Sequence, residues 1–183
     1  MGIKKLNKFL TKNDCIKYYD SLDDVLEIID DNNKFTKRKI FAIDTSLYMY
    51  KYTYSYKNYL VGFLNQISKL LSHNIIPIYV FEGTPPAEKN DVIQMRYEKR
   101  NKLKERITIL QEKLVKETDK EKVAKLESEI KRLSRQIIQI KKNMVESLKE
   151  MLDILKIKYI NSNGESDSMC SYLYKNNFVD AVI

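Results

Sequence analysis

The feature that most restricts the fold of this chain is the segment from residue 89 to residue 156, which contains neither glycine nor proline. Apolar residues recur in it every three or four positions, a spacing that places them on one face of a helix. A polar stretch at 117–122 interrupts this register. We therefore expect two helices folded back on each other as a hairpin, the second longer than the first. The apolar positions are Leu103, Ile107, Leu110 and Leu114, then Val123, Leu126, Ile130, Leu133, Ile137, Ile140 and Met144.

The predicted hairpin also carries most of the positive charge of the chain. Residues 96–150 contain 17 Lys and Arg and 10 Asp and Glu, so they hold +7 of a net charge of +8. Such a surface suits a polyanionic partner, and charge alone does not choose between nucleic acid and an acidic membrane surface. A solvated coiled-coil hairpin that binds a partner protein explains these features equally well.

Short apolar runs elsewhere in the chain predict the strands of a sheet. Residues 39–46 and 75–83 are apolar runs that end in an acid and small residues, and the segment 47–72 between them has the apolar spacing of a helix. A strand, a helix and a second strand in this order predict parallel pairing. The same alternation continues over 156–183, so the fold class is α/β. With only 4 Gly and 3 Pro in the chain, an all-β fold is disfavoured.

Acidic residues follow three of the predicted strands. Asp44 ends the first strand, Glu82 ends the second, and Glu165 and Asp167 lie between a third strand and a helix. The carboxyl ends of parallel strands share one edge of a sheet, where α/β folds bind ligands. Carboxylates that converge beside a basic helical arm suit Mg²⁺ or Mn²⁺ bound against phosphate, which indicates metal-assisted phosphodiester chemistry. The helix dipole alone also accounts for acids in a first helical turn.

Five segments together resemble a known family: MGIKKL, FAIDTSLYMY, YVFEGTPPAEK, RYEKR and NGESDSMCSYL. In order and character they are similar to the structure-specific 5′ nucleases of the flap endonuclease and xeroderma pigmentosum group G superfamily, and YVFEGTPP is the most specific of them. The resemblance covers nearly all of this chain but only the N-terminal part of such a nuclease. It implies metal-dependent hydrolysis of phosphodiester bonds in branched or 5′-ended DNA during replication and repair.

The resemblance also implies an architecture. We expect a parallel-sheet, PIN-like (Rossmann-like) nuclease domain, of which residues 1–183 form a single N-terminal portion. Residues 89–156 are then a basic helical hairpin, or arch, inserted into that domain.

The resemblance assigns roles to particular residues. Asp44, Glu82, Glu165 and Asp167 occupy the positions of acids that bind two divalent metal ions, Mg²⁺ or Mn²⁺. Glu82 stands where the family usually has Asp, and Asp167 where it usually has Glu, so the reach of each ligand changes by one methylene group. Lys89 and Arg96 match basic residues at the start of the arch, and we expect them to neutralise charge on the reacting phosphate as catalytic residues.

Further positions are implied to contact DNA. Lys99 and Arg100 lie just beyond the two catalytic cations. Tyr50 matches an aromatic residue that stacks on the base beside the scissile phosphate. Gly2 matches a glycine near the active site and the DNA.

Two departures from the family pattern bear on function. Asp44 and Glu82 lie 38 positions apart, which is short for the family and predicts a trimmed loop at the duplex-binding wedge. The distal aspartates and the helix-hairpin-helix element of the family are not in this sequence, so we expect a C-terminal polypeptide to complement it. Two alternatives remain open: an enzyme like the 5′-to-3′ exoribonucleases, and a non-catalytic nucleic-acid-binding module with a degenerate nuclease fold.

The sequence also bears on the compartment in which the protein acts. It has two distant cysteines, Cys15 and Cys170, an N-terminus without the apolar core of a signal peptide, and no apolar stretch long enough to span a bilayer. We expect a soluble, intracellular protein with no membrane partner, acting in the nucleus or at another site of DNA replication.

Overall fold

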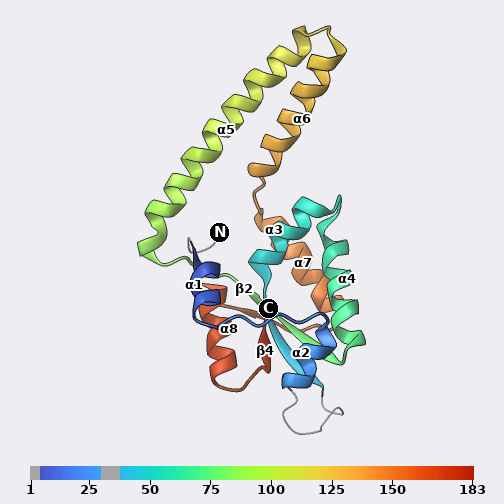
Figure 1. The fold of residues 1–183 in the computed structure, drawn as a ribbon, viewed down its shortest axis with the longest axis vertical. Coiled ribbons are helices and arrows are strands. Elements are labelled where there is room, and N and C mark those ends of the chain that lie inside the picture. Colours follow the sequence, from blue (N-terminus) through green and yellow to red (C-terminus); the bar gives the residue numbers. More distant parts are fainter. Residues whose placement is uncertain (1–4, 30–37) are drawn as a thin grey trace. The chain divides into compact units, whose positions relative to one another are not determined.

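A computed structural model describes residues 5–29 and 38–183 of the chain (Figure 1). It divides the chain into two compact units, Met1–Lys37 and Arg38–Ile183, and each unit is described by itself. Gly2 lies outside the described residues.

The first unit contributes two short helices, α1 (Leu6–Lys12) and α2 (Leu22–Ile29). Helix α2 begins at a capping box. The backbone N–H of Ser21 donates to a carboxylate oxygen of Asp24 at 2.9 Å, and the backbone N–H of Asp24 donates to Ser21 Oγ at 3.1 Å. Each residue thereby satisfies a donor that the first helical turn leaves unpaired.

The second unit is built on a four-stranded parallel sheet with the strand order β3-β2-β1-β4. Its strands are β1 (Lys39–Asp44), β2 (Ile75–Phe81), β3 (Tyr159–Asn161) and β4 (Ala181–Val182). Consecutive residues of β1 and β2 are buried, as in a parallel sheet that is covered on both faces. The predicted α/β class with parallel strands is confirmed.

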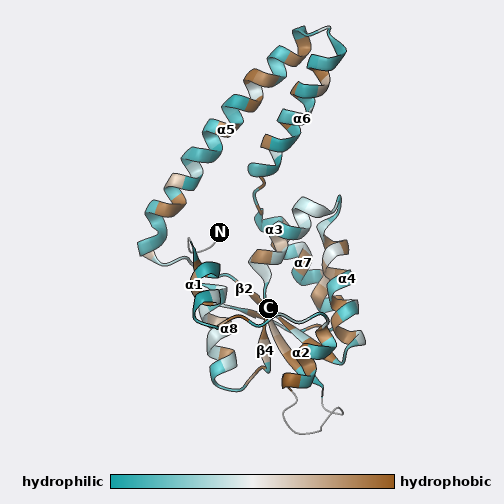
Figure 2. Cartoon of the chain, viewed as in Figure 1, coloured by the Kyte–Doolittle hydropathy of each residue, from teal (hydrophilic) through white to brown (hydrophobic). Residues whose placement is uncertain are grey.

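One face of the sheet is covered by helices α3 (Thr45–Ser55), α4 (Tyr59–Ser72) and α7 (Lys142–Ile154), with Phe63 of α4 in edge contact with Tyr79 of β2 at a centroid distance of 5.7 Å. Helix α8 (Ser166–Lys175) covers the other face, where Cys170 and Leu173 pack against Ala42 and Val80. Figure 2 shows the apolar strands enclosed between these helices. The core thus holds β1 and β2 rigidly, with their carboxyl ends at one edge.

The expectation of a single helix over 47–72 is wrong, because the segment forms two helices. Asn58 begins α4, and its side chain accepts a hydrogen bond from the backbone N–H of Leu60 at 3.1 Å. The two helices pack closely: a Cβ on Gly62 would lie 2.4 Å from Cγ of Tyr52. A glycine at this position therefore allows the aromatic ring of α3 to lie directly on α4.

The predicted hairpin consists of α5 (Asn90–Lys116), which follows a short 3-10 turn at Ala87–Lys89, and α6 (Lys120–Gln136). It has an apolar cluster of its own, and Figure 2 shows hydrophilic residues over most of both helices, with apolar residues between them. Buried residues from both helices form this cluster: Ile107, Leu110 and Leu133, with Leu103, Leu126, Ile130 and Ile137 packed around them.

The prediction that the second helix of the hairpin is the longer one is wrong. Helix α6 ends at Gln136, and the chain re-enters the body of the unit before α7 begins. The intervening residues 137–141 include three isoleucines, whose branched side chains disfavour a helix. Leu148 and Leu152 of α7 are fully buried, so α7 belongs to the body of the unit and not to the arch. The arch therefore consists of α5 and α6 alone.

No helix in the described ranges 5–29 and 38–183 is long and apolar enough to cross a membrane.

The apolar cluster of the arch predicts different effects for two isoleucines on α5. Ile107 is 7% exposed and Ile109 is 52% exposed. We expect Ile107→Ala to destabilise the arch by about 2 kcal/mol, which corresponds to roughly 30-fold faster amide exchange in α5 and α6. Ile109→Ala should leave exchange nearly unchanged. Hydrogen exchange measured by mass spectrometry checks this, and equal exchange in the two variants would contradict an arch stabilised by its own cluster.

Candidate functional site

The candidate site is built around Asp44, which ends β1 and caps the first turn of α3. Its Oδ1 accepts hydrogen bonds from the backbone N–H of Ser46 at 3.0 Å and from Ser166 Oγ at 2.8 Å. Ser166 is the first residue of α8 and is buried. One carboxylate oxygen therefore joins the starts of two helices that lie on opposite faces of the sheet.

Asp167 lies in the first turn of α8, close to Asp44. Partial burial raises the pKa of Asp167, and the charge of Asp44, a hydrogen bond with Asp44 and the charge of Glu165 raise it further, while Lys89 lowers it. The negative charge of Asp44 thus disfavours the ionisation of Asp167. This is the arrangement expected where a cation is to be bound.

The same acids act on Cys170, one helical turn further along α8. Burial, Asp44 and Asp167 raise the pKa of its thiol to about 11. The thiol therefore stays protonated at neutral pH and is a poor nucleophile.

Lys89 brings a positive charge to this edge of the sheet. It ends the 3-10 turn before α5, and its Nζ forms an ion pair with Oε1 of Glu165, the residue that precedes α8. The side chains of Lys89 and Glu165 are 49% and 28% exposed. An ion pair this open to solvent stabilises the fold little, so Lys89 can exchange Glu165 for another anion at small cost.

Glu82 follows β2 at the same edge. In the register of the sheet Asp44 pairs with Val80, so Glu82 lies two residues beyond that level, and its side chain is exposed. It forms no hydrogen bond or ion pair with another described residue. The structure thus brings Asp44, Glu165 and Asp167 together with Lys89 and leaves the Glu82 side chain apart from them.

The metal-binding role of these acids stays a prediction. Among the residues that the structure describes, no three His, Cys, Asp or Glu side chains are grouped so as to hold a metal ion. The donors themselves fit a hard divalent cation, because all are carboxylates and two of them already crowd each other. A cation placed between Asp44 and Asp167 would relieve the repulsion that raises the pKa of Asp167.

The other predicted residues lie on helices that leave this edge. Arg96 is seven residues beyond Lys89, about 10 Å along α5, and forms no ion pair with another described residue. Lys99 is exposed and Arg100 is half-buried on the same helix. Tyr50 on α3 is 48% exposed, so its ring is open to a ligand. The structure therefore places Lys89 alone of these cations in contact with the acids.

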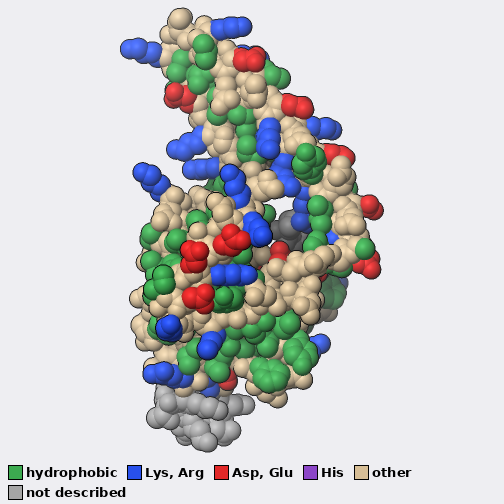
Figure 3. Space-filling view, turned by 180° about the vertical axis from the view of Figure 1, so that it is seen from behind, with side chains coloured by type: hydrophobic (Ala, Val, Ile, Leu, Met, Phe, Trp, Pro, Cys, Tyr) green, Lys and Arg blue, Asp and Glu red, His purple; other side chains and the backbone are tan. Residues whose placement is uncertain are grey.

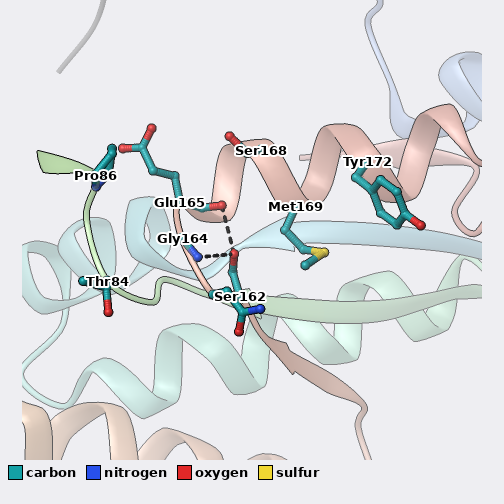
Figure 4. Close-up of a pocket in the computed structure, with 9 residues that line it drawn as sticks. Thr84, Pro86, Ser162, Gly164, Glu165, Ser168, Met169 and Tyr172 are labelled. Carbon is teal, nitrogen blue, oxygen red and sulfur yellow. Dashed lines mark hydrogen bonds between the residues drawn. The ribbon is translucent and has the colours of Figure 1, made fainter. Parts of the chain in front are cut away.

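Sequence reasoning did not single out two serines that organise the acids. Ser166 fixes Asp44, as described above. Ser162 donates to the backbone carbonyl of Glu165 at 3.2 Å and accepts from the backbone N–H of Gly164 at 3.2 Å (Figure 4). Both serines lie within or directly before the segment NGESDS. Serine is common at the starts of helices, so the sequence did not indicate which hydroxyl group would form a hydrogen bond with an acid.

Comparison with known proteins identifies the family. The chain matches the XPG N-terminal domain over residues 1–103, and it belongs to that family. The whole chain is 29% identical to a probable RAD2-like endonuclease, 076L, of invertebrate iridescent virus 3, of which it covers 55%. It is 27% identical to flap endonuclease 1 of Naegleria gruberi, with 99% of this chain and 45% of the relative covered. The chain thus spans about half the length of these curated relatives. The resemblance inferred from the sequence is confirmed.

Solved structures agree with the fold. The catalytic core of Rad2 in complex with DNA substrate superposes with a TM-score of 0.50 at 26% identity, covering 80% of this chain and 36% of that one. Human GEN1 in complex with Holliday junction DNA superposes with a TM-score of 0.57 at 18% identity, covering 99% of this chain and 36% of that one. The GEN1 comparison supports the fold alone.

The close approach of two backbones at this edge yields a prediction about stability. A Cβ on Gly83 would lie 2.1 Å from the carbonyl oxygen of Ser162, whereas a Cβ on Gly164 would meet nothing within 4 Å. The backbone N–H of Gly83 also donates to the carbonyl of Gly164 at 2.8 Å. Gly83→Ala should therefore force the two segments apart and cost about 1–3 kcal/mol.

Gly164→Ala is the matched control and should have little effect. Thermal unfolding followed by circular dichroism measures both variants. Equal melting temperatures would show that the contact between the two segments does not constrain this edge.

Proposed function

We propose that this chain is the N-terminal part of a metal-dependent, structure-specific 5′ nuclease that hydrolyses phosphodiester bonds in branched or 5′-ended DNA. The observation that carries the proposal is the cluster of Asp44, Glu165, Asp167 and Lys89 at the carboxyl edge of the sheet. Membership of the XPG N-terminal domain family supports it.

The acids are proposed to hold Mg²⁺ or Mn²⁺. Asp44 and Asp167 would be the first ligands, because they already face each other, and Glu165 would join them when Lys89 releases it. Glu82 is the remaining candidate and would need its exposed side chain to turn toward the others. A bound divalent ion would polarise the phosphate and favour ionisation of an attacking water, and a complete enzyme would hold two such ions.

Lys89 is proposed to contact the reacting phosphate. Its ammonium group lies among the acids, and its exposed ion pair with Glu165 is weak enough to be exchanged. Arg96 lies further along α5 and would contact a neighbouring phosphate of the same nucleic-acid strand. Positive charge on developing phosphate oxygens is a means of stabilising the transition state.

The arch is proposed to bind the phosphate backbone of the substrate. Residues 90–136 contain 14 Lys and Arg and 9 Asp and Glu, so the arch carries +5 of the net charge of +8, and Figure 3 shows Lys and Arg side chains spread over both helices, with acidic side chains between them. Figure 3 also shows an opening below the arch that is bordered by basic side chains. Tyr50, Lys99 and Arg100 are the proposed DNA contacts nearest the site.

Two further elements belong to the proposal. The substrate is nucleic acid in a branched or 5′-flapped form, at a site of DNA replication or repair such as the nucleus. A complementing C-terminal polypeptide is proposed because the curated relatives extend well beyond the part that they share with this chain.

A second candidate function is a non-catalytic module that binds nucleic acid. It is favoured by one observation, the lack of any group of three potential metal ligands among the described residues. The two functions differ in their response to divalent metal. Cleavage of a 5′-flap DNA that requires Mg²⁺ and is lost in Asp44→Ala supports the nuclease. Salt-sensitive binding without cleavage, even with the complementing polypeptide, supports the module.

Removal of one of the two facing carboxylates should raise the stability of the protein and weaken its binding of divalent metal ions. Without divalent ions, Asp167→Asn should melt at a higher temperature than the wild type, because its repulsion with Asp44 is gone. Millimolar Mg²⁺ should raise the melting temperature of the wild type, and the variant should respond much less, because it has lost a ligand.

The control is Glu127→Gln, which removes one negative charge from an exposed position on α6. It should behave as the wild type with and without Mg²⁺. Differential scanning fluorimetry measures all three proteins, and an equal response to Mg²⁺ in all of them would contradict a metal site at Asp167.

Neutralising the start of the arch should weaken nucleic-acid binding in a salt-dependent way. A variant with Gln at four positions of α5 should bind more weakly, and its plot of log affinity against log salt should be flatter by about one unit per lost phosphate contact. The four positions are Lys99, Arg100, Lys102 and Lys104.

A control variant changes four exposed lysines outside the arch to Gln and so alters the net charge equally. Fluorescence anisotropy over a salt series compares the two variants. Equal losses would indicate a diffuse charge effect, and unchanged affinity in the arch variant would support the solvated hairpin that binds a protein. The control positions are Lys57, Lys69, Lys158 and Lys175.

A further inference from the structure

We propose that a pocket beside Glu165 binds one unstacked nucleobase of the strand whose phosphate Lys89 contacts. The pocket lies between the loop after β2 and helix α8, and has a volume of about 430 Å³. This is within the range of small-molecule sites, roughly 300–1,000 Å³. The inference rests on the proposed function, and it adds a base-binding subsite to the acids and cations already described.

The walls of the pocket suit a flat, polarisable ring. Pro86, Met169 and Tyr172 supply its apolar surface, and Figure 4 shows Met169 between Tyr172 at one end and Pro86 with Glu165 at the other. Aromatic rings and thioethers make favourable contacts with π systems. Stacking on an aromatic side chain accepts any base, because every base has a π face.

Two hydroxyl groups are available to a base edge. Thr84 and Ser168 line the pocket, and neither side chain makes a hydrogen bond to another residue in the described part of the chain. Ser162, by contrast, is occupied by its bonds to Gly164 and Glu165. The pocket thus combines an apolar surface with a few free polar groups, as ligand sites do.

Tyr172 is held in place as a platform. It is 56% exposed, but its ring lies 6.3 Å from that of Phe178, tilted by 32°. The backbone N–H of Phe178 donates to the carbonyl of Leu173 at 2.9 Å, and Leu173 is buried against the sheet. A ring positioned before binding loses little conformational freedom when a base stacks on it.

The charge beside the pocket indicates a nucleotide as the occupant. Glu165 lines the pocket, and Lys89, which does not line it, forms an ion pair with Glu165. A base in the pocket would therefore place its own phosphate near an ammonium group that can exchange partners. An aromatic or proline side chain of a partner protein would fill the apolar part but would leave Lys89 unused.

Helix α8 offers a matched control for Tyr172. Tyr174 is 55% exposed on the same helix and does not line the pocket. Two residues along a helix correspond to a rotation of about 200°, so the two tyrosines point to opposite sides. Replacing either one removes the same chemical group from the same helix.

The test measures binding of a labelled 5′-flap DNA in EDTA, so that no cleavage occurs. We expect Tyr172→Ala to weaken binding by about 10-fold, because one base loses the aromatic side chain on which it stacks. Tyr172→Phe should bind as the wild type, and so should Tyr174→Ala. Thermal melting of each variant shows whether the fold is retained.

Abasic positions introduced one at a time along the single strand locate the base. At one position, an abasic site should weaken binding of the DNA to the wild-type protein as much as the Tyr172→Ala substitution weakens binding of the intact DNA. The same abasic site should not weaken binding to Tyr172→Ala any further. Equal losses in Tyr172→Ala and Tyr174→Ala, or abasic losses that persist fully in Tyr172→Ala, would overturn the inference. A partner-protein occupant is indicated if DNA binds with the expected salt dependence but without any effect of Tyr172.

The same binding experiments distinguish an error in the base-pocket proposal from an error in the proposed function. A wild-type chain that shows no salt-sensitive binding of DNA contradicts both proposals. Binding that depends on the arch lysines but not on Tyr172 contradicts only the base pocket.

Discussion

The parallel pairing of β1 with β2 is the constraint on which the rest of the structure depends. Its register places Asp44 opposite Val80, so both strands end at one edge with their acids just beyond. The buried residues of β1 lock this register, because a shift by one position would turn Phe41 and Ile43 to the opposite face. Apolar residues in the middle of the strands therefore fix the position of charged residues at their ends.

The acids at this edge lie close enough to one another to interact. Burial raises the pKa of Asp167, and the charge of Asp44 and a hydrogen bond with Asp44 raise it further. The contact between Lys89 and Glu165 offsets part of this repulsion without excluding water. A fold selected for stability alone would not bring these acids together, and a site that binds cations requires it.

Much of this arrangement was predictable from the sequence, because strands and strand ends leave strong local patterns. The apolar runs predicted β1 and β2 and the acids that end them, and α8 lies within 156–183, where the sequence predicted that the alternation of strands and helices continues. The break between α3 and α4 was not predicted, because it depends on how Tyr52 packs on Gly62. Helix α2 was overlooked although Ser21 and Asp24 form a recognisable capping box.

The residues missed at the site share a physical cause. Ser166 bonds Asp44 across 122 positions, and Tyr172 lines a pocket with Thr84 from another element. Such contacts depend on tertiary structure and leave no local pattern. The lengths of the arch helices were mispredicted for a related reason. The regular spacing of apolar residues continues past Ile137. Beyond that residue, however, the apolar side chains are buried in the body of the unit and do not pack in the hairpin.

Both helices of the arch make side-chain contacts with the body of the unit. At the start of α5, Lys89 contacts Glu165. At the end of α6, the guanidinium of Arg135 lies 5.0 Å from the ring centroid of Tyr54 and donates to its hydroxyl at 3.4 Å. Tyr54 lies near the end of α3, the helix that begins at Asp44. The arch is therefore attached to the body of the unit at both of its ends, at one end through an acid of the site and at the other through the helix that Asp44 caps.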